Sequence, residues 1–417
     1  MPMSTYGAHE AVRIGASRFL GPPDARKARV AVTAVFFVHG LLFASWVAHI
    51  PHVKEQLHLG NGALGFALLG APVGSVLAMT LAARLLPRLG SRRLVQIALV
   101  GYCVAGPLVG LGRSLAGLFL ALLAWGVFQG TLDVSMNTQG LSVERATGSP
   151  LMPGFHGSWS LGSFAGAALG TVGVAIGLSL SEQVLVLAAP TLLIVGVLTT
   201  QMLPDEIAGL TSESQRRASL RHTLRNATMI VLGAIAFADM LCEGAAAEWS
   251  AVYLRDNKHT TLAFAGLGFT VYSLAMVSVR LSGNRLLRWQ RPERLLPVLA
   301  GVATFGLLLG LVTNETAVLL AGFGCLGLGL ALVVPTVFSA AGRVSGVNPG
   351  TAIAVVSAFG WTGFVCGPPL IGQIASAWSL RIALGLLPIL TALIAFATAR
   401  SIAMRSSIPG QGEARRS

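Results

Sequence analysis

The chain has 417 residues, of which 54% are apolar, 11% are charged and 50 are glycine. An ordinary globular chain carries about 25% charged residues, so this composition excludes most soluble folds. The formal net charge of +13 would in a soluble protein raise the question of a nucleic-acid partner. Here the basic residues lie in gaps between apolar runs, which indicates membrane topology and no nucleic acid.

Twelve apolar runs are each long enough to cross a bilayer, which takes ~20 residues. We therefore expect an all-α membrane protein with twelve transmembrane helices. The predicted spans are residues 30–50, 62–86, 94–112, 115–138, 153–178, 183–203, 227–252, 262–287, 295–313, 317–341, 351–376 and 380–400. Residues 1–29 and 401–417 are predicted tails.

The longest polar segment, residues 204–226, predicts a loop between two six-helix domains, 30–203 and 227–400. The tails and alternate loops, this one included, hold 23 of the 29 Lys and Arg residues, the other loops hold five, and Arg280 lies within a span. The positive-inside rule predicts that this basic side, with both termini, faces the cytoplasm of an inner-membrane protein.

The two predicted domains share sequence features at a nearly constant offset. Trp46 recurs as Trp249, 203 residues later, and Trp159 recurs as Trp361, 202 residues later. The run 64–66, Leu-Gly-Phe, recurs at 267–269. Parallel six-helix repeats are the architecture of major facilitator transporters.

Four sequence motifs carry a resemblance to a known family. These motifs are Gln129 to Asn137, Phe155 to Ser160, Glu243 to Trp249 and Phe338 to Arg343. On these the chain resembles the major facilitator superfamily and, within it, the bacterial YbjJ-like group of permeases, distantly similar to fucose permeases. The resemblance implies a twelve-helix fold in two domains and solute transport by alternating access.

The loop between the second and third spans departs from the superfamily pattern. It keeps Arg88, Gly90 and Arg92, but Pro87 stands at the acidic position. In the matching loop of the second domain that position is Asn284, followed by Arg285. The resemblance implies that these loops gate the cytoplasmic side, here without the usual carboxylate.

Ionisable groups inside a membrane are costly, so each is a candidate for function. Gln129, Asp133 and Asn137 follow one another at spacings of four and therefore share one stripe of a helix. This stripe predicts a cavity wall, with Asp133 as a proton-carrying group; the alternative is an Asp held by hydrogen bonds to neighbouring helices. His156 is expected near the depth of Asp133, as a coupling partner or as an interfacial residue beside the 144–145 loop.

Two further spans contain candidates. His39 lies midway along the first span, as a second proton-coupling candidate or as a hydrogen-bonded packing residue. Asp239 and Glu243 share a face of the seventh span, and two carboxylates so close repel unless a proton or cation intervenes. We expect Glu243 to be a proton-coupling acid, Asp239 to line the substrate cavity, and Arg280 to be able to supply the cation.

Trp159 and Trp361 lie inside spans and are candidate cavity residues, alongside Gln129, Asn137 and Asp239, whereas packing is the alternative. Three histidines at positions 49, 52 and 58 fall in a loop with no metal-binding spacing and are expected to be solvated. Prolines at positions 335, 368 and 369 are expected to break the tenth and eleventh spans.

The sequence contains no phosphate-binding loop, and its two Gly-x-Gly-x-x-Gly matches lack a βαβ context. We expect no cofactor, no metal and no enzymatic activity. The predicted function is secondary transport of a small polar solute, such as a sugar, coupled to protons, by a monomer. The alternatives are a proton-driven exporter of amphiphilic compounds and a non-transporting membrane sensor.

Overall fold

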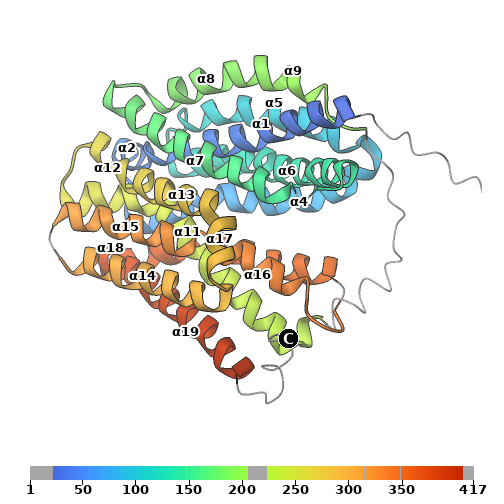
Figure 1. Ribbon diagram of the computed structural model, residues 1–417. Coiled ribbons are helices and arrows are strands. Elements are labelled where there is room, and N and C mark those ends of the chain that lie inside the picture. Colours follow the sequence, from blue (N-terminus) through green and yellow to red (C-terminus); the bar gives the residue numbers. More distant parts are fainter. Residues whose placement is uncertain (1–21, 150, 205–222, 314, 348, 407–417) are drawn as a thin grey trace, which may run out of the picture.

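The computed structural model describes residues 22–149, 151–204, 223–313, 315–347 and 349–406, and within these ranges it is helical without β-strands (Figure 1). The described helices are α1 (Pro22–Val47), α2 (Ile50–Gln56), α3 (Asn61–Leu68), α4 (Gly70–Leu89), α5 (Ser91–Val109), α6 (Leu115–Thr147), α7 (Met152–Ala175), α8 (Leu180–Pro190), the π-helix η1 (Thr191–Val195), α9 (Gly196–Thr199), α11 (Ala227–Lys258), α12 (Leu262–Ala265), α13 (Leu267–Trp289), α14 (Pro292–Val312), α15 (Thr316–Leu330), α16 (Val333–Ala341), α17 (Pro349–Ala377), α18 (Leu380–Leu384) and α19 (Leu386–Ser406).

Local chemistry sets several helix ends. The Ser114 hydroxyl accepts a hydrogen bond from the backbone N–H of Gly117 at 3.1 Å and so begins α6. The Asn226 side chain begins α11 in the same way, accepting from Thr228 at 3.0 Å. α4 ends at Leu89 and is followed by Gly90, whose φ of +77° is a conformation that glycine adopts at little cost.

Eleven stretches of the described residues are long and apolar enough to cross a membrane, one fewer than the sequence predicted. The expected fifth span does form, as the 24-residue helix α7. Its glycine, serine and histidine residues lower its mean hydropathy, so it is not among the eleven apolar stretches. The first crossing stretch starts at Asp24, inside the expected tail of residues 1–29, because α1 already begins at Pro22. Proline is favoured in the first turn of a helix.

The closest helix contacts occur in matching pairs. A Cβ atom added at Gly162 of α7 would clash with the backbone oxygen of Phe37 in α1. A Cβ atom added at Gly363 of α17 would clash in the same way with the backbone oxygen of Phe237 in α11. Small residues allow helix backbones to approach closely in membranes. The pairs α1–α7 and α11–α17 are therefore two copies of one packing arrangement.

A second pair of contacts repeats in the same way. Gly126 of α6 lies against the backbone of Ala71 in α4, and Gly327 of α15 lies against that of Tyr272 in α13. Figure 1 shows α1 and α4–α9, the first set of helices, on one side of the molecule and α13–α19, with α11, on the other as the second set. The domain boundaries themselves stay a prediction, since residues 205–222 of the expected central loop lie outside the described residues.

The tenth span divides into α15 and α16. Pro335 has no N–H to donate to the carbonyl oxygen four residues earlier, that of Ala331, and the helix is interrupted at that turn. The expected break in the eleventh span is wrong, because α17 continues through Pro368 and Pro369. Neighbouring helices can accommodate proline within a membrane helix, and Gly65 packs against the Pro368 backbone oxygen here.

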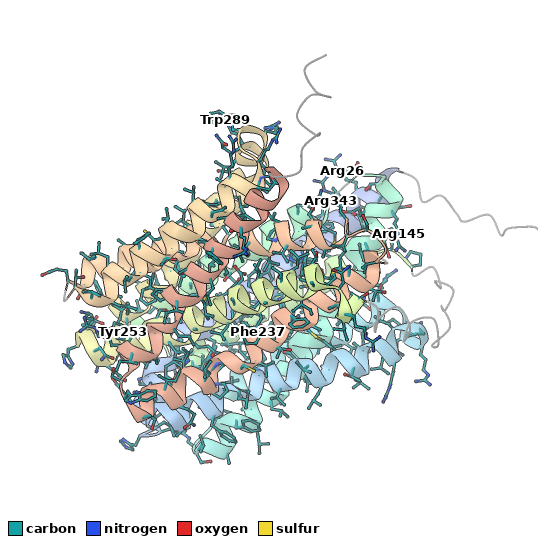
Figure 2. All side chains as sticks on the ribbon, turned by 90° about the horizontal axis from the view of Figure 1, so that it is seen from below. Arg26, Arg145, Phe237, Tyr253, Trp289 and Arg343 are labelled. Atoms are coloured by element: carbon teal, nitrogen blue, oxygen red, sulfur yellow. The ribbon has the colours of Figure 1, made fainter. Side chains whose placement is uncertain are left out.

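The two ends of the bundle differ in charge. Figure 2 shows Arg26, Arg145 and Arg343 close to one end, which we call the basic end. Tyr253 lies at the opposite end, which we call the far end. The far end includes α2, because Lys54 of α2 forms an ion pair with Asp256, near the end of α11.

Candidate functional site

Arg280 on α13 connects the two sets of helices. Its Nη1 donates a hydrogen bond of 2.7 Å to the Ser160 hydroxyl on α7, and its Nη2 lies 3.8 Å from Oε2 of Glu243 on α11. Its Nε donates to the backbone oxygen of Ala331 at 3.2 Å. That oxygen lacks a helical partner because residue 335 is proline. A break in a neighbouring helix therefore helps to orient the arginine.

Asp239 lies one helical turn before Glu243 on α11, so the predicted shared face is present. The Asp239 side chain is fully buried, and neither carboxylate oxygen has a hydrogen-bond partner within the described chain. Glu243 is 13% exposed and Arg280 is 15% exposed. Asp239, which has no hydrogen-bond partner among the described residues, thus lies beside the partly exposed ion pair of Glu243 and Arg280.

A small cavity adjoins this ion pair between α7, α11 and α13. Its volume is about 10 Å³, which is room for roughly one water molecule. The Tyr272 hydroxyl and the Ser273 hydroxyl are buried beside it without hydrogen-bond partners among the described residues. We call this region the central polar site, and its members are Ser160, Asp239, Glu243, Tyr272, Ser273 and Arg280.

His39 and Trp159 form a buried pair between α1 and α7. The indole nitrogen of Trp159 donates a hydrogen bond of 2.8 Å to Nδ1 of His39. Since an indole only donates, Nδ1 is unprotonated and the neutral imidazole carries its hydrogen on Nε2. The ring also stacks on Tyr102, with centroids 5.4 Å apart. Both predicted residues are therefore near the centre of the fold and in direct contact.

Aromatic rings continue from Trp159 across to the second set of helices. Phe43 stacks on Trp159 at 6.3 Å and meets Phe364 of α17 at 6.4 Å. Phe364 contacts Trp361 edge-on at 5.7 Å. All four rings are half-buried. We call Phe43, Trp159, Trp361 and Phe364 the aromatic wall; it brings together both tryptophans that the sequence proposed for the cavity.

The predicted polar stripe is present on α6. Asn137 donates from Nδ2 to the Asp133 backbone oxygen at 2.8 Å and to Oδ1 of Asp133 at 3.2 Å. Gln129 is buried, whereas Asp133 and Asn137 are half-buried. His156 is exposed and packs edge-on against Phe36 at 5.3 Å. Within the described ranges, no hydrogen bond or ion pair joins His156 to Asp133.

The loops expected to gate the basic end make few contacts. Arg88 is exposed and Arg92 half-buried, and no ion pair is found for either among the described residues. Arg285 is exposed and lies over the Trp289 ring at 5.5 Å. The side chain of Asn284 lies outside the described part of the structure.

A carboxylate does organise the neighbouring turn at the basic end. Oε2 of Glu144 accepts hydrogen bonds from the backbone N–H groups of Leu151 at 2.6 Å and Met152 at 2.9 Å. A negative charge is favourable at a helix N-terminus, so Glu144 stabilises the start of α7.

The far end is held by ion pairs between α2 and α11. Lys54 pairs with Asp256, and Nε of Arg255 pairs with Glu55. Nearby, α3 and α17 touch through Gly65 and Gly372, where an added Cβ would meet the opposite backbone. These contacts all join α2 and α3, which lie between α1 and α4 in the chain, to helices of the second set.

His49 corrects the expectation of three solvated histidines. Its side chain is 1% exposed, and Nε2 has no hydrogen-bond partner within the described residues. Burial lowers its pKa from the ordinary value of 6.5 to about 4, with a smaller contribution from nearby His52.

The sequence pattern does not single out Ser160, Tyr272 or Ser273 individually, and it marks Arg280 only as a possible counter-charge. Ser160 closes a motif that the resemblance had already singled out, so its position carried a signal. Tyr272 and Ser273 carried none, because only the packing of α13 against α7 and α11 turns them toward the ion pair.

An all-helical chain with repeated bundles and ionisable groups between them has the architecture of a membrane transporter. The sequence profile of the Major Facilitator Superfamily matches residues 31–349. The chain belongs to this superfamily.

Curated relatives agree with this assignment. The chain is 30% identical over 400 residues to an uncharacterised MFS-type transporter of Yersinia pestis, covering 96% of this chain and 100% of the relative. It is 31% identical over 364 residues to an uncharacterised transporter of Sinorhizobium fredii, covering 87% and 95%. It is 32% identical over 365 residues to the membrane protein MosC of Rhizobium meliloti, covering 85% and 86%.

Solved structures share the fold. A crystal structure of a mutant form of the nucleoside transporter NupG superposes with a TM-score of 0.74 at 12% identity, over 90% of this chain and 99% of that one. A bacterial homologue of the human lysosomal transporter Spinster, in an inward-facing and unoccupied conformation, gives 0.69 at 14% identity, over 94% and 100%.

Proposed function

We propose that this chain is a proton-coupled secondary transporter that moves a small polar solute by alternating access. The observation that carries the proposal is the position of Arg280. This one side chain holds Ser160 of the first set of helices and Glu243 of the second, beside the unpartnered Asp239. A change of charge at these acids would act directly on a contact between the two sets.

In the proposed cycle a proton enters from one side and binds the acid pair Asp239 and Glu243. An ionised carboxylate buried without a partner is costly, so Asp239 needs either that proton or the charge of Arg280. Protonation of Glu243 weakens its attraction for Arg280, and Arg280 is then free to rearrange as the bundles rock. The proton leaves on the other side together with the solute.

Asp133 stays a second proposed proton carrier. Its Asn137 hydrogen bond gives it a partner that Asp239 lacks, and it has no contact with Arg280 among the described residues. For this reason we place the main coupling step at Asp239 and Glu243. His39 and His156 are proposed to modulate it, His39 through its contact with Trp159.

The proposed solute carries several hydroxyl or amide groups on a compact ring. Unpartnered Tyr272 and Ser273 offer hydrogen bonds, and the aromatic wall offers a flat apolar surface. Sugars and nucleosides combine these two features. The likeness in fold to a nucleoside transporter is compatible with a nucleoside. An amphiphile exporter would need a wider apolar cavity.

We further propose that the basic end faces the cytoplasm of an inner membrane, following the positive-inside rule. In that orientation the ion pairs between α2 and α11 close the external side. The exposed His156 would then lie on the cytoplasmic side of the central polar site.

The test is a flux assay in liposomes that contain the purified protein and an internal pH dye. Pools of sugars, nucleosides and amphiphilic cations are added outside. We expect one polar pool to change the internal pH with wild-type protein, and Glu243→Gln to abolish that change. Asp24→Asn, at an exposed acid of the basic end, is the matched control and should behave as wild type.

Three results would contradict the proposal. A response to amphiphilic cations alone would favour the exporter. Solute uptake without proton movement would remove the coupling. A response abolished by Asp133→Asn but unchanged in Glu243→Gln would move the coupling step to α6.

A further inference from the structure

A second cavity lies on the outer surface of the first set of helices, away from the central polar site. It is a groove of about 700 Å³ between α1 and the segment formed by α8 and η1. Its lining residues are Arg26, Arg29, Val30, Thr33, Ala34, Phe37, Val38, Leu41, Ser158, Leu187, Pro190, Thr191, Ile194 and Val195. Nothing in the transport cycle proposed above uses this groove.

One wall of the groove contains a wide helical turn. Pro190 has no N–H to donate, and the chain after it adopts the five-residue π-helix η1. π-helical turns inside α-helices are rare and often occur at functional sites. Thr191 and Val195 of η1 line the groove opposite α1.

The groove changes character along its length. Arg26 and Arg29 lie at the basic end, where the first crossing stretch begins, and both are exposed. From Val30 to Leu41 the α1 wall is mostly apolar. The hydroxyl groups in this part are used internally, since that of Ser158 on α7 donates to the Thr33 backbone oxygen at 3.0 Å and that of Thr33 donates to the Arg29 backbone oxygen at 2.8 Å.

The dimensions match one lipid leaflet. Arg26 and Leu41 are 15 residues apart on α1, which corresponds to about 22 Å along the helix. Half of the hydrocarbon core is about 15 Å thick, so the apolar part of the groove takes one acyl chain and leaves the arginines at headgroup level.

Charge identifies the headgroup. Arg26, Lys27 and Arg29 outnumber Asp24 in this first part of α1, and all four side chains are exposed. Guanidinium groups bind phosphate through paired hydrogen bonds. We propose that the groove is a binding site for an anionic phospholipid, with its phosphate between Arg26 and Arg29 and one acyl chain along Val30 to Leu41.

The experiment measures lipid association with the full-length protein in vesicles of phosphatidylcholine. Spin-labelled phosphatidylglycerol or spin-labelled phosphatidylcholine is added, and the immobilised fraction is read by electron paramagnetic resonance. A basic residue near an anionic membrane surface contributes about fivefold in affinity. We therefore expect Arg26→Gln with Arg29→Gln to lower the preference for phosphatidylglycerol by fivefold or more.

Matched variants separate this site from general surface charge. Arg288→Gln with Arg291→Gln removes two other exposed arginines and should leave the preference unchanged. Ala34→Phe fills the groove without altering charge and should displace the immobilised lipid, whereas Ala392→Phe, at an exposed alanine of α19, should not. Glycerol 3-phosphate should not compete.

The proposal is overturned if both arginine pairs lower the preference equally, because the effect is then one of surface charge. It is also overturned if Ala34→Phe leaves lipid immobilisation intact or if glycerol 3-phosphate competes, because the acyl chain then contributes nothing. None of these readouts requires transport activity.

Discussion

The side chain of Arg280 donates a hydrogen bond of 3.2 Å to the backbone oxygen of Ala331, an acceptor that is free because residue 335 is proline. This relationship links a helix break in α15–α16 to the orientation of the charge at the central polar site. The arginine is thereby directed toward Ser160 on the other set of helices.

Replacing this proline should therefore impair transport while strengthening the helix. Pro335→Ala supplies an N–H that competes for the Ala331 oxygen, and a hydrogen bond to a charged group contributes about 1.5–3 kcal/mol. We expect solute uptake at least tenfold slower in liposomes, with an unchanged or higher melting temperature. Pro297→Ala in α14 is the control; equal losses in both variants would contradict this role of Ala331.

The repeated glycine contacts should be among the least tolerant positions of the fold. Gly162→Ala places a methyl group against the Phe37 backbone oxygen, which must force α7 away from α1. Gly301→Ala in α14 meets no atom within 4 Å and should be neutral or stabilising by up to about 1 kcal/mol. Thermal unfolding in detergent compares the two, and similar melting temperatures would argue against the observed α1–α7 packing.

The ion pair between Lys54 and Asp256 should stabilise closure of the far end. Its two side chains are 13% and 30% exposed, so we expect a contribution of about 1 kcal/mol or less. Lys54→Asp and Asp256→Lys should each increase labelling of a cysteine introduced at Gly62 of α3, where an added Cβ would touch only side chains of α17 such as that of Ser376, and the double variant should restore protection. Failure of the double variant to restore it would show that the pair does not hold this end.

Acidification should weaken the packing around His49. Its pKa is lowered to about 4 in the folded chain, against 6.5 when exposed, so the unfolded chain binds more protons between these values. Stability from this residue is complete above pH 6.5 and falls as the pH drops toward 4, by up to about 3 kcal/mol. Melting temperatures at pH 7.5 and 5 should differ more for wild type than for His49→Gln, and equal differences would contradict this account.

Relations within a single helix could be predicted from spacing. Asp133 and Asn137 are four residues apart and do form a hydrogen bond. Asp239 and Glu243 share a face for the same reason. Gly162, Gly166 and Gly170 are likewise spaced by four, a pattern that favours close helix packing, and all three lie against backbone oxygens of α1.

Relations between helices could not be predicted in this way, because spacing does not determine which faces meet. Spacing leaves open whether His156 contacts Asp133 or lies at the interface beside residues 144–145, and the structure places its exposed ring against Phe36. The bonds from Trp159 to His39 and from Arg280 to Ser160 join residues 120 positions apart. Burial of His49 could not be predicted because the spacing of histidines 49, 52 and 58 does not determine which of them the neighbouring helices cover.

The most direct test of proton coupling compares two transport modes of Glu243→Gln in liposomes, once a substrate is known. One mode is uptake driven by an imposed pH gradient, and the other is exchange of labelled for unlabelled solute without a gradient. We predict that the variant loses driven uptake but keeps exchange, because solute binding and rocking persist while the proton site is gone. Gradient-driven uptake at the wild-type level would contradict it.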